Sequence, residues 1–354
     1  MGVYGGPNKV KGGIVFSLDG ANPNSYAGDS PTTAGTDYAY FGGGYGGPSP
    51  GYITTVQRID FSNDTATAAA KGPLSLARGS MAATGSSSYG YYGGGVGDPG
   101  SFTTVDRIDY SSDTGTTPTK GPLSGTRKNN AAVGNNSYGY FGGGNPGGST
   151  VDRIDYSSDT GTTPTKGPLS AAKWYLCATG NQSYGYIGGG STGSSISTVD
   201  RIDYSSDTST ASPKGPLSTA RHGGGATGNT SYGYFGGGSP YPGVTIVDRL
   251  DYSSDTTACA TKGPLAAARN YYKATGNEDY GYWAGGNPSQ MSTVNRIDYS
   301  NDTATAAAKG PLATGVSNAA GASSRANANP TAGSPATRSA TAPAGTPYGY
   351  VGHG

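Results

Sequence analysis

Polar and apolar residues alternate along short stretches of the chain, which is the period-two pattern of β-strands. In the stretch 151–156, successive side chains fall on opposite faces of an extended backbone. A small-residue stretch at 130–133 and an aromatic stretch at 138–141 precede it, and an outer stretch ending in Lys-Gly-Pro-Leu at 166–169 follows it. Turn-forming residues lie between these stretches, so the pattern predicts four short strands joined by turns.

This four-strand unit is repeated along the chain about every 48 residues, a period typical of propellers and solenoids. The second strand carries Tyr-Gly-Tyr-x-Gly-Gly-Gly or a near copy, which begins at Tyr38, Tyr89, Tyr138, Tyr184, Tyr232, Tyr280 and Tyr348. The third strand carries Val-Asp-Arg-Ile-Asp-Tyr with small variations, which begins at Val56, Val105, Val151, Val199, Val247 and Val294. Four antiparallel strands in a unit of this length predict one blade of an all-β propeller.

The ends of the chain suggest how the ring closes. Because the second-strand marker has seven copies and the third-strand marker has six, we expect seven blades, the last one built from residues 10–44 and 313–354. The alternating stretch 13–19 is a candidate strand for that blade, and closure would remove the exposed sheet edges. Residues 316–345, rich in Ala, Ser, Asn and Pro, read as a non-repeat insertion in this single domain of residues 1–354. Six blades plus a separate terminal strand is the alternative.

The amino-acid composition argues against several classes of function. The 354 residues include 64 Gly and 23 Pro and are only 33% hydrophobic, which leaves little material for long amphipathic helices or membrane-spanning segments. Lys plus Arg number 23 against 22 Asp plus Glu, so no basic field attracts nucleic acid. The start of the chain lacks the layout of a secretion signal, and two cysteines cannot form a disulfide framework. We therefore expect neither nucleic acid binding nor membrane insertion.

One arginine recurs in every third-strand marker. An unpaired buried charge is costly, so we expect each of these arginines to pair with a carboxylate of its own or the adjoining blade. Six copies at the same place indicate a scaffold role and not an anion site. The arginines are Arg58, Arg107, Arg153, Arg201, Arg249 and Arg296.

The residues give little support to catalysis. Ser111–Thr117 and Ser157–Thr163 resemble the Asp-box of sialidases, which in that family is a structural turn, and Glu278 is the single glutamate. Only two histidines exist, which is too few for the copper site of radical oxidases or for a zinc cluster. The carboxylates best placed to form a pair, Asp98 and Asp279, belong to different blades. We expect no enzyme activity, no cofactor and no metal.

Comparison among the repeats separates a constant face from a variable one. The turns between the first and second strands and between the third and fourth barely change, whereas the loops on the opposite face vary strongly. A variable face on a constant scaffold is where recognition is expected, with aromatic rings as anchors. The candidate binding residues are Trp174, Tyr175, His222, Tyr241, Tyr271, Tyr272 and Trp283. The alternative is that these side chains only fill space between blades.

The glycine run after an aromatic strand and the Pro-Leu-x-x-Ala-Arg segment resemble the kelch-type β-propeller, although the kelch tryptophan is missing from the outer strand. The sequence motifs YGYFGGG, TVDRIDYSSDT and KGPLS are similar to those of repeat proteins of tailed phages of marine cyanobacteria. This resemblance implies a non-enzymatic virion protein of a tail fibre or capsid, located on the particle surface.

The partners implied are a host-surface glycan, other virion proteins, or further copies of the chain in a homo-oligomer. A free-standing lectin-like or protein-binding propeller of cellular origin is the alternative, and a glycan-active enzyme is a third.

Overall fold

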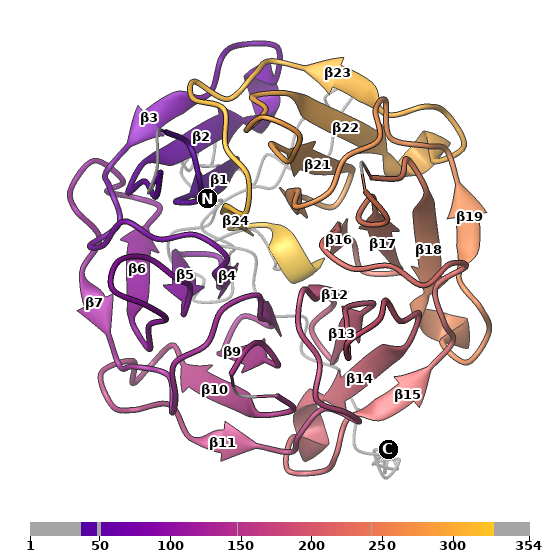
Figure 1. Cartoon of the computed structure of the whole chain (residues 1–354), viewed down its shortest axis with the longest axis horizontal. Helices are drawn as coiled ribbons and strands as arrows, with labels where there is room; N and C mark the ends of the chain where they lie inside the picture. Colours follow the sequence, from indigo (N-terminus) through magenta and orange to yellow (C-terminus); the bar gives the residue numbers. More distant parts are fainter. Residues whose placement is uncertain (1–36, 48–50, 147, 242, 329–354) are drawn as a thin grey trace, which may run out of the picture. The chain divides into compact units, whose positions relative to one another are not determined.

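The chain folds as a β-propeller with six blades around one axis (Figure 1). The computed structural model describes residues 37–47, 51–146, 148–241 and 243–328, all of which belong to the compact unit of residues 33–331. Each blade is a four-stranded antiparallel sheet. The all-β propeller predicted from the repeat is confirmed, and the expected number of seven blades is wrong.

In each blade the strands follow one another from the inner strand at the axis to the outer strand at the rim. Blade 1 consists of β24 (Ala320–Ser323), β1 (Tyr38–Gly42), β2 (Val56–Asp60) and β3 (Ala69–Lys71). Blade 2 consists of β4 (Ala82–Gly85), β5 (Tyr89–Gly93), β6 (Val105–Asp109) and β7 (Thr119–Lys120). Blade 3 consists of β8 (Ala131–Gly134), β9 (Tyr138–Gly142), β10 (Val151–Asp155) and β11 (Thr165–Lys166).

The other three blades repeat this order. Blade 4 consists of β12 (Cys177–Gly180), β13 (Tyr184–Gly188), β14 (Val199–Asp203) and β15 (Ser212–Lys214). Blade 5 consists of β16 (Gly225–Gly228), β17 (Tyr232–Gly236), β18 (Val247–Asp251) and β19 (Ala260–Lys262). Blade 6 consists of β20 (Lys273–Gly276), β21 (Tyr280–Ala284), β22 (Val294–Asp298) and β23 (Ala307–Lys309).

Blade 1 closes the ring with strands from both ends of the described chain. Strand β24 pairs with β1 in antiparallel register, with Ala39 opposite Ser323 and Gly42 opposite Ala320. We expected the residues of β24 to lie in the insertion 316–345 because Ala-Gly-Ala-Ser departs from the Ala-Thr-Gly or Ala-Val-Gly ending of the other inner strands. The marker at Tyr348 and the candidate strand 13–19 lie outside the described residues.

Aromatic side chains fill the space between neighbouring blades. In the cluster between blades 2 and 3, Tyr91 and Phe141 are fully buried together with Val105 and Ile154. Phe141 lies against Gly93, where an added Cβ would come within 2.5 Å of the ring. The glycine that ends the second strand in blades 1 to 5 is therefore needed for the close approach of the next blade, and Ala284 takes its place in blade 6.

An ionic cluster links each blade to the next. Asp159, in the turn between the third and fourth strands of blade 3, accepts hydrogen bonds from Tyr91 Oη (2.9 Å) and Arg107 Nη1 (2.8 Å) of blade 2. The Lys120 ammonium of blade 2 lies 3.1 Å from the same carboxylate. Burial alone would raise the pKa of Asp159, but the hydrogen bonds from Tyr91 and Lys120 and the charge of Arg107 hold it below its ordinary value.

The same cluster occurs at all six blade boundaries, and its aspartates are Asp64, Asp113, Asp159, Asp207, Asp255 and Asp302. At the closing boundary, Asp64 of blade 1 accepts from Tyr282 and Arg296 of blade 6. The expectation that the repeated arginines pair with carboxylates is confirmed, and the partner is always in the adjoining blade.

Candidate binding site

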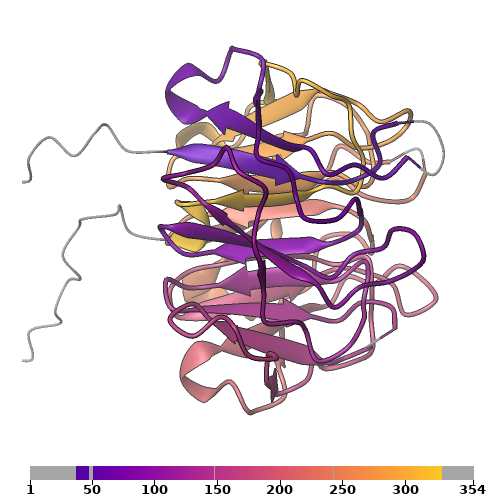
Figure 2. The ribbon, with the colours of Figure 1, turned by 90° about the vertical axis from the view of Figure 1, so that its left-hand side faces the viewer.

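The propeller has two faces, which Figure 2 shows in side view. The constant turns lie on one of them, called here the turn face, where the 3-10 turns η1 (Phe61–Asn63), η2 (Tyr204–Ser206), η3 (Tyr252–Ser254) and η4 (Tyr299–Asn301) follow the third strands. The variable loops lie on the opposite face. The described chain both begins and ends on the turn face, where Arg325 Nε, just before η5 (Ala326–Ala328), is 3.7 Å from Asp37 Oδ1.

On the variable face, six equivalent residues form a closed ring of backbone hydrogen bonds around the axis. Each lies two residues before an inner strand, and its N–H donates to the carbonyl of the equivalent residue in the preceding blade, at 2.6–3.1 Å. Going round the ring, the donors are Ser80, Asn129, Tyr175, Gly223, Tyr271 and Asn318, and the last of them accepts from the first.

All six residues of this ring have a left-handed backbone, with φ between 53° and 68°. Glycine adopts this conformation freely and asparagine tolerates it, whereas a tyrosine there costs roughly 1–2 kcal/mol. Tyr175 and Tyr271 are nevertheless held at φ 57°. Backbone strain of this kind persists only where the surroundings impose it, and it concentrates at functional sites.

The side chains of the ring line a cavity at the mouth of the propeller, with a volume of about 320 Å³. Gly223 has no side chain, so blade 5 contributes nothing to the lining. The lining residues are Tyr45, Ser80, Val96, Lys128, Asn129, Tyr175, Tyr271, Asn287, Gln290, Ser317 and Asn318. Amide, hydroxyl and aromatic groups therefore dominate the mouth, and none of these described lining residues carries a carboxylate.

Two tyrosines meet across the position of Gly223. The ring centroids of Tyr175 and Tyr271 are 5.6 Å apart. An added Cβ on Gly223 would lie 3.1 Å from two ring atoms of Tyr271. The missing side chain thus gives Tyr271 the room to lean toward Tyr175, and the two rings form an aromatic wall of the cavity.

Burial favours the protonated phenols of Tyr271 and Tyr45. It raises the pKa of Tyr271, with neighbouring Tyr175 adding to the effect. Burial also raises the pKa of Tyr45, whose hydroxyl donates to Tyr52 Oη at 2.9 Å. At neutral pH these side chains are neutral hydrogen-bonding groups with an exposed aromatic surface.

His222 lies behind Tyr175, with 5.3 Å between the ring centroids. Its Nδ1 is 2.9 Å from Ser195 Oγ and its Nε2 is 3.1 Å from Ser239 Oγ. Burial lowers the pKa of His222. Both ring nitrogens are already occupied by hydroxyl groups, so His222 supports the aromatic wall and has no nitrogen left for a ligand.

The other predicted site residues are dispersed. Trp174 is half-buried beside the mouth, and Tyr241 is 76% exposed in a loop away from the cavity lining. Tyr272 and Trp283 are fully buried, so these two side chains fill space in the core, which was the alternative to a binding role. Tyr272 follows Tyr271 and so points to the opposite side, where its hydroxyl donates to Ala267 O at 2.6 Å.

Trp283 takes the position that Phe141 has in blade 3, between two blades, and donates from Nε1 to Gly225 O at 3.1 Å. Sequence reasoning did not select Tyr45, Lys128, Gln290 or Asn318 for the site. These residues share a position in the repeat unit, since each lies shortly before an inner strand or shortly after a second strand. The repeat could therefore have identified them.

The described residues offer few groups for other chemistry. In this part of the chain no three His, Cys, Asp or Glu side chains come together in a way that could hold a metal ion. Asp98 lies in a loop of the variable face and Asp279 in a turn of the opposite face, so the two carboxylates do not form a pair. No helix within the described ranges is long and apolar enough to cross a membrane.

Comparisons with known proteins add no family. No protein-family model matches the chain, and no curated protein is significantly similar to it. The site must therefore be interpreted from its own geometry.

Proposed function

We propose that this chain is a non-enzymatic recognition protein of a tailed-phage virion, a tail-fibre or capsid component that binds a host-surface glycan at the mouth cavity. The observation that carries the proposal is the ring of left-handed residues, which holds changing side chains on a constant backbone around a cavity.

The ring separates scaffold from recognition. Its six backbone positions are equivalent and hydrogen-bonded in the same way, while its side chains are Ser, Asn, Tyr, Gly, Tyr and Asn. A residue that served only to close the ring would best be glycine or asparagine at every position. Retaining strained tyrosines at two positions is understandable if their rings contact a ligand.

The chemistry of the cavity favours a saccharide. A volume of about 320 Å³ is at the small end of ligand pockets and suits one or two sugar units. Asn129, Asn287 and Gln290 offer amide donors and acceptors to hydroxyl groups, and the aromatic wall offers flat surfaces to the C–H face of a sugar ring. Lys128 adds one positive charge, which favours a sugar that carries a carboxylate.

The turn face is a suitable surface for attachment to a particle. The described residues begin at Asp37 and end at Ala328 on this face. Attachment by the turn face would leave the mouth pointing outward. The similarity of the repeat to repeat proteins of phages of marine cyanobacteria supports the same assignment.

Mass spectrometry of purified phage particles from the source culture tests the virion assignment. We expect repeat peptides flanked by unique loop residues, such as those around Trp174, at stoichiometric levels. Their presence only in soluble or host fractions would contradict a virion role and would favour a free-standing lectin-like propeller.

A further inference from the structure

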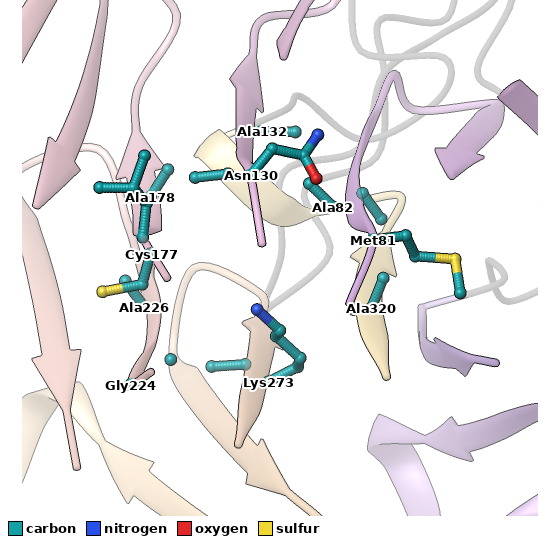
Figure 3. A pocket seen from close by; sticks show the side chains of 16 residues that line it. Met81, Ala82, Asn130, Ala132, Cys177, Ala178, Gly224, Ala226, Lys273 and Ala320 are labelled. Atoms are coloured by element: carbon teal, nitrogen blue, oxygen red, sulfur yellow. The ribbon is translucent and has the colours of Figure 1, made fainter. Parts of the chain in front are cut away.

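The inner strands enclose a second, smaller cavity on the axis of the propeller, with a volume of about 40 Å³ (Figure 3). Its lining consists mainly of alanine and glycine residues from all six blades. Lys273 of β20 is the one charged residue among the described residues that line it. The nitrogen of Lys273 points into the middle of the ring of inner strands (Figure 3).

Lysine is exceptional at this position of the repeat. The equivalent residues in the other blades are Ala82, Ala131, Cys177, Gly225 and Ala320. Small side chains are sufficient there for the inner strands to pack. The lysine is therefore an addition to the scaffold and not one of its requirements.

Lys273 is half-buried, and its ammonium makes neither a hydrogen bond nor an ion pair with another described residue. By contrast, the buried Lys173 lies 3.0 Å from Asp200. Burial lowers the pKa of Lys273, which reflects the cost of an uncompensated charge. The nearest titratable group is Cys177, and burial raises the pKa of its thiol to about 11, so it provides no negative charge at neutral pH.

A second polar group borders the same cavity. Asn130 of blade 3 stands across the ring from Lys273 of blade 6. Its side chain is fully buried, and neither its amide nitrogen nor its amide oxygen has a hydrogen-bond partner. Its amide nitrogen lies beside Gly94 of blade 2, so the amide faces the boundary between blades 2 and 3 and not Lys273.

We propose that the axial cavity binds one small monovalent anion of the size of chloride, held by the Lys273 ammonium. The volume of about 40 Å³ exceeds what one water molecule requires and is sufficient for a small ion. The anion supplies the counter-charge that no side chain provides. This site is separate from the mouth cavity and does not depend on the proposed function.

The test uses bromide, which replaces chloride and is visible by anomalous scattering. We expect a bromide peak beside Lys273 Nζ in crystals of the intact chain. We also expect the melting temperature to rise by a few degrees when bromide replaces gluconate at constant ionic strength, because an anion that binds only the folded state stabilises it.

The controls come from the repeat itself. Lys273→Ala copies Ala82 and Ala131, and Asn130→Leu copies Leu176, so both variants place a residue that the scaffold already accepts. Lys273→Ala should abolish both the bromide peak and the difference between anions, and Asn130→Leu should leave both unchanged. Equal anion dependence in the Lys273→Ala variant, or a cavity without bromide, would overturn the proposal.

Discussion

Replacing Asn295 by aspartate should stabilise the propeller, because blade 6 contains a buried arginine without its carboxylate. In blades 2 to 5, a buried aspartate of the third strand pairs with a buried Arg or Lys that precedes the first strand, at 2.7–3.0 Å. In blade 6 the arginine is retained as Arg269, but Asn295 stands at the aspartate position. Both amide atoms of Asn295 lack a partner, and Arg269 donates instead to Gly285 O at 3.3 Å.

In blade 1 both members of the buried ion pair are replaced together. There the cation is replaced by Val316 and the aspartate by Gln57, whose amide bonds to both backbone groups of Thr314. The serine after Lys-Gly-Pro-Leu, whose hydroxyl donates to the aspartate in blades 2 to 4, is alanine at the equivalent positions of blades 1 and 6. Only blade 6 lost the carboxylate and kept the cation.

The magnitude follows from the four intact pairs. Removing one partner of a buried ion pair costs about 3–5 kcal/mol, because a charge remains uncompensated. Blade 6 is already in that state, and the new carboxylate must itself be desolvated. We therefore expect Asn295→Asp to gain about 1–3 kcal/mol, or roughly 2 °C of melting temperature per kcal/mol for a domain of this size. Adding Ala266→Ser should contribute about 1 kcal/mol more by restoring the serine donor.

Urea denaturation of the variants measures these free energies directly. The matched control is Asp152→Asn, which creates the same defect in blade 3 and should cost about 3–5 kcal/mol. In an Arg269→Met background, Asn295→Asp should be destabilising, since the carboxylate then has no cation. If Asn295→Asp leaves the stability of the otherwise unchanged chain equal or lower, the reasoning about Arg269 is refuted.

Three further predictions concern the blade boundaries and the ring. The pKa values of Asp159 and of two equivalent aspartates are depressed on folding. The stability that these carboxylates contribute is therefore present above the unfolded pKa of about 3.9 and is lost as the pH falls through the folded pKa. The urea midpoint should be level from neutral pH to about pH 5 and should fall below about pH 4. Gly121→Ala should destabilise the protein by several kcal/mol, because the added Cβ would lie 1.7 Å from Gly161 O of the next blade. Gly161→Ala is the control: its Cβ would meet nothing within 4 Å, and stability should change by less than about 1 kcal/mol. Calorimetry of the two variants separates the effect of close approach from that of backbone entropy. Tyr175→Gly should weaken ligand binding but change the free energy of unfolding by no more than about 1 kcal/mol, because relief of the left-handed backbone strain offsets the lost burial of the ring. A large loss of stability would show instead that Tyr175 is a packing residue.

Repetition explains what could be predicted from the sequence. The alternation in 151–156 and its copies was sufficient for the four-stranded blade, and the need to pair Arg107 and its equivalents was sufficient for the ionic clusters. The blade count was wrong because the Ala-Gly-Ala-Ser of β24 departs from the ending of the other inner strands.

The site was only partly predictable, because exposure depends on side-chain direction. Tyr271 and Tyr272 are adjacent in sequence, yet the left-handed backbone at Tyr271 places one ring in the mouth and the other in the core. Nothing in the residue type indicates a positive φ at a tyrosine. Lys273 was overlooked, although the Ala-Thr-Gly that follows it aligns it with Cys177 and Gly225 in the sequence repeat.

Glycan-array binding by the intact chain tests the central claim most directly, with the Tyr175→Gly and Tyr271→Ala variants measured beside it. The control is Tyr241→Ala, which removes an exposed aromatic ring that does not line the cavity. We expect selective binding to a small set of saccharides, lost in both mouth variants and retained in the control. Absence of binding by the unchanged chain, or equal binding by all three variants, would contradict recognition at the mouth of the propeller.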